Sequence, residues 1–439
     1  MIIQFVNILE ELLQKINFIN FEIDLFVILL YMIICTPLGF VFHLIKSPTG
    51  RLYYNLFMGI FFSVIVCKEW FPIMLGWTIA IYFIAQIFKK CALPVSIAAF
   101  GILSFVHIYR LIYQYLSWRM DYNAIQMLLT ARYIFYACDK QDGKVEGKTN
   151  FMMYLSYIFM FPNLVVAPIP FYAFVSLIER KTDYTHYSPK FAMISFLKAI
   201  AVSMAELLIR PHFDTDWFYT DEWKNQYSIW FKFAMFFIIT PCARFTYIAA
   251  FYFTQAAMDA MGLTYNDKTK KNDLWVVFDY SFELEKNVVI KTQKWNCNIQ
   301  NWLKYCFYDR LLKRFGSLTF YLVFMISSLW HGFYLSYYLF FIFWAITGQV
   351  YKYFYKAQKR FYFIPQTIRH ILAWVFGILT FDHFATAVRV LEWEKALELH
   401  NSVYWIPHII ILVIFLFFNI TQFGQKDGRS KSTKPKKEE

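Results

Sequence analysis

The chain has 439 residues, of which 59% are hydrophobic and 22% aromatic, and its formal net charge is +13 at pH 7. This composition excludes an ordinary soluble protein of this length, and long recurring apolar runs predict a polytopic helical membrane protein. Segments of about ten residues with alternating polarity, which would favour a β-barrel, do not occur. The basic excess is typical of cytosolic loops near anionic headgroups, so we expect membrane lipids and no nucleic acid as partners.

The apolar residues of Met1 to Ile19 share one helical face and predict a short helix in the membrane interface, with no basic region of a signal peptide. The apolar or amphipathic runs that follow predict an all-α polytopic membrane protein of about ten transmembrane helices, within a range of roughly 9–12. These runs are Phe26–Leu44, Leu52–Cys67, Phe71–Phe88, Ala92–Tyr113, Phe151–Leu177, Phe191–Ile209, Ser228–Met258, Trp295–Arg314, Ser317–Tyr351, His370–Val390 and Val403–Phe423.

Prolines interrupt the run Phe151–Leu177 at Pro162, Pro168 and Pro170. Two prolines separated by one residue exclude a regular helix, and irregular backbone at membrane depth must be buried in protein or line a cavity. We therefore expect re-entrant or broken segments around a central chamber. Residues 1–423 are expected to form one membrane-embedded domain, and the Lys-rich residues 424–439 a disordered basic cytosolic tail.

The seven cysteines show no paired spacing, and most lie in apolar segments. They are interpreted as reduced packing residues, with neither a disulfide framework nor a zinc site. We expect no metal site and no cofactor.

His331 stands out because no Asp, Glu, Lys or Arg occurs from Phe315 to Tyr351, and Gly332 follows it directly. Polar groups at membrane depth are costly, so this imidazole should face the bundle interior or a water-filled cavity. Glycine lets a backbone or a ligand approach closely at that point. A purely structural hydrogen bond between helices and a functional role both remain open from position alone.

The second unusual stretch, Trp295 to Lys304, places Trp295 and Trp302 on one face if it is helical, with Asn296 beside that face. An interfacial helix with tryptophan anchors would show the same pattern.

Together the two stretches resemble the membrane-bound O-acyltransferase family, and most of all its lysophospholipid acyltransferase branch. The family pattern is Trp-Asn, then Trp-Leu, then Trp-His-Gly with aromatic residues behind it. Here it corresponds to Trp295-Asn296, Trp302-Leu303 and Trp330-His331-Gly332, followed by Tyr334, Tyr337 and Tyr338.

Upstream, the stretch from Phe161 to Pro168, which includes Asn163, looks like the family's proline-containing segment, and Asp121 with Gln126–Thr130 resembles an earlier one. Ile299, Ala167 and Ser336 depart from residues that the branch often has, which leaves the acceptor headgroup open.

The resemblance implies transfer of a fatty acyl chain from acyl-CoA to the free hydroxyl of a lysophospholipid. It implies His331 as the general base and Asn296 as the second catalytic polar residue. Neutral imidazole suits a base near pH 7, and an apolar environment disfavours its charged form. Residues expected to bind substrate are Trp295, Trp302, Trp330, Asn163, Tyr334, Tyr337, Tyr338 and Arg310.

Several alternatives remain. The basic residues around Asn296, among them Arg310, could attract the CoA phosphates or only reflect the positive-inside bias. The acceptor could be diacylglycerol, a sterol or a secreted protein. A channel or transporter with His331 as a gating or proton-relay residue, or an inactive scaffold, would also keep these residues, although we find no internal repeat typical of transporters.

The last residues, Lys436-Lys437-Glu438-Glu439, look like the dilysine retrieval signal of endoplasmic reticulum membrane proteins. This predicts a multi-pass protein of that membrane with a cytosolic C-terminus, whose tail coat proteins could recognise. The oligomeric state stays open.

Overall fold

The computed structural model of the chain describes residues 23–116, 122–180 and 189–421, with side chains from Phe26 onward. The predicted interfacial helix before Ile19, Asp121 of the family-like segment and the basic tail lie outside the described residues. The regular secondary structure of the described residues is helical apart from one small antiparallel ladder, β1 (Tyr265–Asn266) paired with β2 (Lys271–Asn272).

The bounds of the helices follow from the structure. They are α2 (Ile23–Leu44), α3 (Pro48–Cys67), α4 (Phe71–Ile87), α5 (Ala92–Tyr113), α6 (Tyr122–Gln141), α7 (Phe151–Ile158), α8 (Phe171–Glu179), α9 (Lys190–Ile209), α10 (Asp221–Asn225), α11 (Ile229–Ala243), α12 (Phe245–Ala260), α13 (Val288–Lys294), α14 (Cys297–Leu303), α15 (Asp309–Phe315), α16 (Leu318–His331), α17 (Leu335–Lys356), α18 (Gln366–Val390), α19 (Trp393–Asn401) and α20 (Ile406–Thr421). A π-helical turn, Lys304–Tyr308, joins α14 to α15.

Several helices begin where a polar side chain caps the first turn. Ser47 accepts a hydrogen bond from the backbone N–H of Gly50 at 2.9 Å, just before Pro48 opens α3. Asn150 accepts one from the backbone N–H of Met153, also at 2.9 Å, and α7 follows. Each cap satisfies one of the donors that the start of a helix leaves unpaired, which fixes the first residue of the helix.

The described residues contain six helical segments long and apolar enough to span a membrane, or seven if the bent pair α19–α20 counts as one span. This number is lower than the nine to twelve expected from apolar runs. Two consecutive runs, Leu52–Cys67 and Phe71–Phe88, join into one longer helical segment, Pro48–Ile87. The apolar helix α16 is shorter than such a span, with 14 residues. The polytopic helical membrane fold itself is confirmed.

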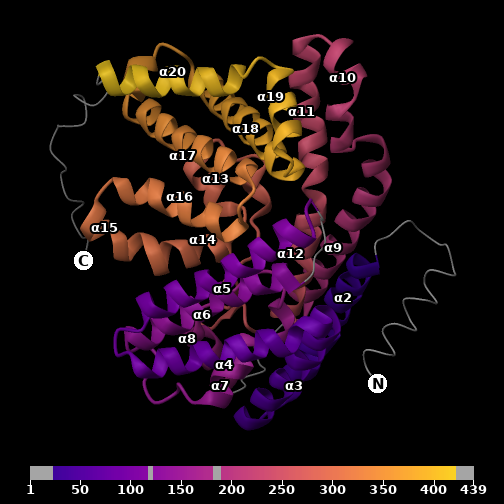
Figure 1. Cartoon of the computed structure of the whole chain (residues 1–439), viewed down its shortest axis with the longest axis vertical. Helices are drawn as coiled ribbons and strands as arrows, with labels where there is room; N and C mark the ends of the chain where they lie inside the picture. Colours follow the sequence, from indigo (N-terminus) through magenta and orange to yellow (C-terminus); the bar gives the residue numbers. More distant parts are fainter. Residues whose placement is uncertain (1–22, 117–121, 181–188, 422–439) are drawn as a thin grey trace.

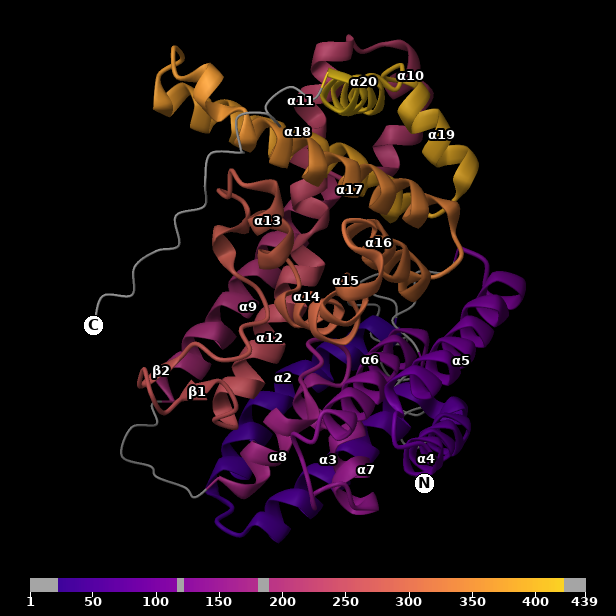
Figure 2. The same ribbon diagram turned by 90° about the vertical axis from the view of Figure 1, so that its left-hand side faces the viewer.

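The helices fall into two groups with a layer between them (Figures 1 and 2). Helices α2 to α8 pack together at the lower end, and α17 to α20 lie at the upper end. α14, α15 and α16 lie between the two groups in both views. α12 packs against both α2 and α9 and so connects the N-terminal group to the middle of the chain. The two sequence stretches singled out above therefore meet in the interior.

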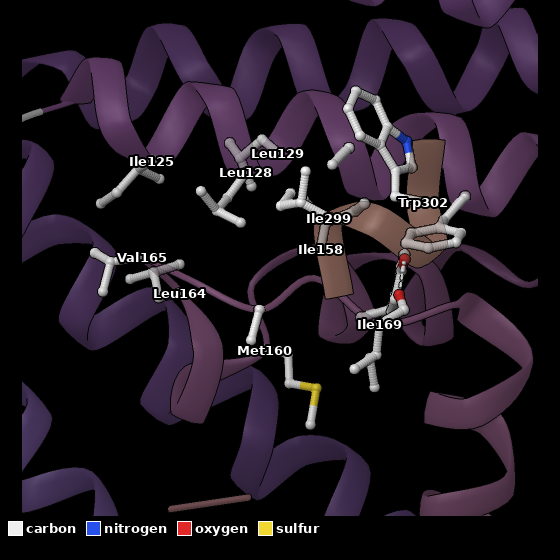
Figure 3. Packing of buried hydrophobic residues seen from close by; sticks show 14 of the residues in the cluster. Ile125, Leu128, Leu129, Ile158, Met160, Leu164, Val165, Ile169, Ile299 and Trp302 are labelled. Atoms are coloured by element: carbon white, nitrogen blue, oxygen red, sulfur yellow. Dashed lines mark hydrogen bonds between the residues drawn. The ribbon is translucent and has the colours of Figure 1, made fainter. Parts of the chain in front are cut away.

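The segment between α7 and α8 is irregular and buried, as its prolines predict. Arg132 of α6 binds it with its guanidinium, donating to the carbonyl of Ile158 and, at 2.5 and 2.7 Å, to the carbonyl and Oδ1 of Asn163. Apolar residues of α6, α14 and this segment, such as Ile125, Ile299 and Val165, belong to one buried cluster (Figure 3). The carbonyls that a helix would have paired are thus satisfied by a buried cation.

Candidate active site

The long apolar run around His331 consists of two helices, α16 and α17, with a break at Gly332. Gly332 has φ +129°, a backbone conformation that residues with a Cβ rarely adopt. Its N–H donates to the carbonyl of Ser328 at 3.1 Å. This glycine ends α16 immediately after His331. The imidazole therefore lies at a helix end and not in the middle of a span.

The ring of His331 is half-buried among aromatic rings. The ring centroids of Tyr337 and Phe341 lie 5.3 and 5.2 Å from its own. Among the described residues neither ring nitrogen of His331 has a hydrogen-bond partner, and neither is enclosed like the buried unpaired polar atoms elsewhere. The imidazole is thus surrounded by apolar groups and still open to a ligand.

His107 of α5 fixes the backbone next to this imidazole. Its Nε2 donates to the carbonyl of Trp330, 3.1 Å away. Its Nδ1 faces Gly332, where an added Cβ would lie only 3.2 Å from that nitrogen. The sequence interpretation missed His107, although a histidine and an arginine inside one apolar span, His107 and Arg110, are the kind of signal that marks a function.

Trp330 and Trp302, both predicted to bind substrate, contact each other. Their ring centroids are 5.8 Å apart, which joins α16 to α14 directly. Trp330 is also held from α6, because its Nε1 donates to the carbonyl of Met127 at 2.8 Å. The Nε1 of Trp302 is buried without a partner in the part of the chain that the structure describes. The two tryptophans therefore place the Trp-His-Gly stretch against the Trp-Asn stretch.

Asn296 lies at the start of α14 as its N-cap. Its Oδ1 accepts a long hydrogen bond, 3.5 Å, from the backbone N–H of Ile299. Its Nδ2 has no partner within residues 23–116, 122–180 and 189–421, and it is not enclosed. One side of this carboxamide thus caps the helix, while the other can donate a hydrogen bond to a ligand.

Asn298, two residues further on, behaves differently. It is 1% exposed, and both its Oδ1 and its Nδ2 are enclosed with no partner among the described residues. Such an amide costs free energy because it has lost its hydrogen bonds to water. No feature of the sequence distinguishes it from Asn296 beyond the family pattern.

Trp295 packs in a cage of aromatic rings and contacts none of the other predicted site residues through its ring. Its nearest ring centroids belong to Phe282 and Phe251, at 5.3 and 5.4 Å. It anchors the start of the Trp-Asn stretch against α12.

The predicted tyrosines lie on the C-terminal side of His331. Tyr337 contacts the imidazole ring, and the ring of Tyr334 lies 6.2 Å from that of Tyr337. The hydroxyl of Tyr334 accepts a hydrogen bond from the backbone N–H of Leu116 at 3.0 Å. Tyr338 is half-buried and packs against a small apolar cluster that contains Tyr334, Tyr337 and Leu391. These three side chains hold the start of α17 against the end of α5.

Asn163 and Arg310 do not belong to this aromatic group, and the side chains of both already form hydrogen bonds to other protein groups. The Oδ1 of Asn163 accepts from Arg132, and its Nδ2 donates to the carbonyl of Ala167 at 2.6 Å. Arg310 donates to Asp142 at 2.6 Å.

The Arg310 contact belongs to a polar cluster that joins α6 to the π-helical turn. The Tyr305 hydroxyl donates to Asp139 and Asp142, at 2.9 and 2.7 Å. Burial would raise the pKa of the Asp142 carboxyl, but the hydrogen bonds from Tyr305 and Arg310 outweigh it and hold this pKa below its ordinary value. A cleft of about 420 Å³ opens nearby, lined by residues such as Lys144, Lys148 and Glu179.

Comparison with known proteins gives a consistent result. The sequence pattern of the membrane-bound O-acyltransferase family matches residues 79–386. The lysophospholipid acyltransferase of Schizosaccharomyces pombe is 22% identical over 90% of this chain and 86% of its own. The membrane-bound glycerophospholipid O-acyltransferase 1 of Mus musculus is 24% identical over 89% of this chain and 88% of its own. Lysophospholipid acyltransferase 6 of Drosophila melanogaster is 26% identical over 77% of this chain, but the match spans only 52% of the fly protein.

Proposed function

Because the chain belongs to the membrane-bound O-acyltransferase family, we propose that it transfers a fatty acyl chain from acyl-CoA to the free hydroxyl of a lysophospholipid. The names of the fission-yeast, mouse and fly relatives support this acceptor class. Both substrates carry long apolar chains, which gain about 0.8 kcal/mol per buried methylene and so reside in the membrane with the enzyme.

One observation carries the proposal: the His331 imidazole lies in an apolar interior with both nitrogens unpaired and open among the described residues. A neutral imidazole can take the proton of the acceptor hydroxyl as its oxygen attacks the thioester carbonyl. The new ester bond forms, the carbon–sulfur bond breaks, and the proton on the imidazolium passes to the leaving thiolate. No covalent enzyme intermediate is needed.

Asn296 is the second catalytic residue of the proposal. The attack places negative charge on the carbonyl oxygen, which a preorganised donor stabilises. The unpaired Nδ2 of Asn296 is such a donor, and the helix cap made by its Oδ1 keeps the amide oriented. Donation to the thioester itself or to His331 would use the same atom.

The remaining predicted residues complete the proposed site. Trp302, Trp330, Tyr337 and Tyr338 line the acyl and acceptor region. Trp295 and Tyr334 support it from behind.

Two further residues would act from outside this lining. Arg310 would bind a CoA phosphate, and because Asp142 already neutralises it, the phosphate must compete with that carboxylate. Asn163 would shape the chamber through its loop. We further propose residence in the endoplasmic reticulum membrane with the tail in the cytosol, on the Lys436-Lys437 pair.

The test uses membranes that contain the full chain, labelled acyl-CoA and a panel of lysophospholipids, with diacylglycerol and a sterol as other acceptors. We expect labelled phospholipid from the wild type and none from His331→Ala or Asn296→Ala. The exposed residues His212 and Asn225 provide matched alanine controls, which should keep activity. Near wild-type transfer by His331→Ala would overturn the base assignment, and transfer to only another acceptor would overturn the lysophospholipid assignment.

A further inference from the structure

Three histidines outside the proposed active site converge where α18, α19 and α20 meet (Figure 1). They are His383 of α18, His400 near the end of α19 and His408 near the start of α20. All three are buried, and one nitrogen of each lies within 4.8 Å of the other two. Three imidazoles are therefore gathered from three helices onto one small volume.

The spacing of the nitrogens matches a metal site. The Nδ1 of His400 and the Nε2 of His383 are 3.2 Å apart. Zinc binds imidazole nitrogen at about 2.0–2.1 Å in tetrahedral geometry, so two of its ligand nitrogens lie about 3.3 Å apart. The centroid of the His408 ring lies 4.5 Å from that of His400 and 5.2 Å from that of His383. A small rotation of His408 would complete a triangle of ligands.

The hydrogen bonding of the cluster is incomplete without a ligand. Four of its ring nitrogens are enclosed with no partner in the described part of the chain: Nδ1 of His383, Nε2 of His400 and both nitrogens of His408. Aromatic rings surround the group, with the Phe343 centroid 4.4 Å from that of His408. Buried polar atoms are normally paired, and unpaired ones of this number call for an unseen ion or molecule.

We propose that His383, His400 and His408 bind a divalent metal ion of the zinc class. Neutral imidazole is a preferred ligand of such ions, and three of them leave a fourth position for water or an anion. The sequence expectation of no metal site considered only the cysteines, which lie elsewhere. The three histidines do not contact His331, so the site is separate from the proposed chemistry.

The bend between α19 and α20 indicates what the ion does. The two helices meet at 80°, and the turn places Tyr404 and Trp405 at φ +53° and +55°. Two successive side-chain-bearing residues in this region are strained. His400 and His408 lie on either side of the turn, and His383 lies on α18, against which α19 packs. A metal ion bound by all three would lock the bend onto α18.

The experiment uses the full chain purified in detergent with an affinity tag that contains no histidine. After loading with zinc and removal of free ion, metal is measured by mass spectrometry. We expect about one zinc per chain for the wild type, a fall of at least about tenfold for His400→Gln, and retention in His400→Cys, whose thiolate also binds zinc. The exposed His212→Gln is the matched control and should keep its metal.

A second measurement needs no variant. The chelator 1,10-phenanthroline should lower the melting temperature of the wild type, whereas its 1,7 isomer, which does not chelate, should leave it unchanged. The proposal is overturned if the loaded wild type holds less than about a tenth of an equivalent, or if His400→Gln and His408→Gln both keep the wild-type metal content.

Discussion

His107 donates a hydrogen bond to the carbonyl of Trp330, 3.1 Å away and 223 residues further along the chain. The bond holds α5 against the end of α16, and its acceptor belongs to the residue directly before His331. His107 is therefore a positioning residue, since it acts on the reacting imidazole through the backbone.

His107→Ala should lower kcat by roughly 10- to 100-fold, because a small displacement of His331 weakens proton transfer. His107→Gln should keep most of the activity. The side-chain Nε2 of glutamine can reach the position of the histidine Nε2 and would still donate to the carbonyl of Trp330. The rates with a saturating lysophospholipid measure this. Equal loss in both variants would contradict the hydrogen-bond role.

Gly332→Ala should destabilise the protein by about 1–3 kcal/mol, because φ +129° strains a side chain and the new Cβ would press on His107. Thermal unfolding in detergent measures the change. Gly101→Ala, in the same helix as His107 and with open space around its Cβ, is the control and should cost nothing. A Gly332→Ala protein as stable as the wild type would show that the break in the backbone is not constrained.

Asn296 and Asn298 should respond in opposite ways to replacement by leucine. Asn296→Leu should lower kcat by about 10²–10³-fold, the usual cost of losing a donor to a developing oxyanion. Asn298→Leu should keep activity and raise stability, because it removes an enclosed amide that costs about 1–3 kcal/mol. Activity and unfolding of both variants decide this. A large loss of activity in Asn298→Leu would move the donor role to that residue.

Asn163→Ala should lower the melting temperature and leave KM nearly unchanged. Arg132 and the Ala167 carbonyl would both lose a partner in a buried segment. Unfolding and KM for acyl-CoA and lysophospholipid are measured on the same preparation. A raised KM with unchanged stability would instead support the direct substrate contact expected from the family resemblance.

The sequence by itself was enough to predict a helical polytopic membrane protein, the irregular segment at Pro168 and Pro170, and an unusual imidazole at His331. These features depend on local properties, namely the length of apolar runs, the geometry of proline and the isolation of one titratable group. The count of spans did not follow from the same reasoning. Hydropathy does not show whether neighbouring runs join into one helical segment or where a helix such as α16 stops short.

Only the tertiary structure decided which polar atoms are paired. Asn163 and Asn296 are the same residue type in similarly polar motifs, yet one has both amide atoms bonded and the other keeps a free donor among the described residues. His107 gains its partner from a helix far along the chain. His383, His400 and His408 meet only because the consecutive helices α18, α19 and α20 fold back on one another. Local patterns cannot supply those partners, because burial and hydrogen bonding depend on how distant segments pack against each other.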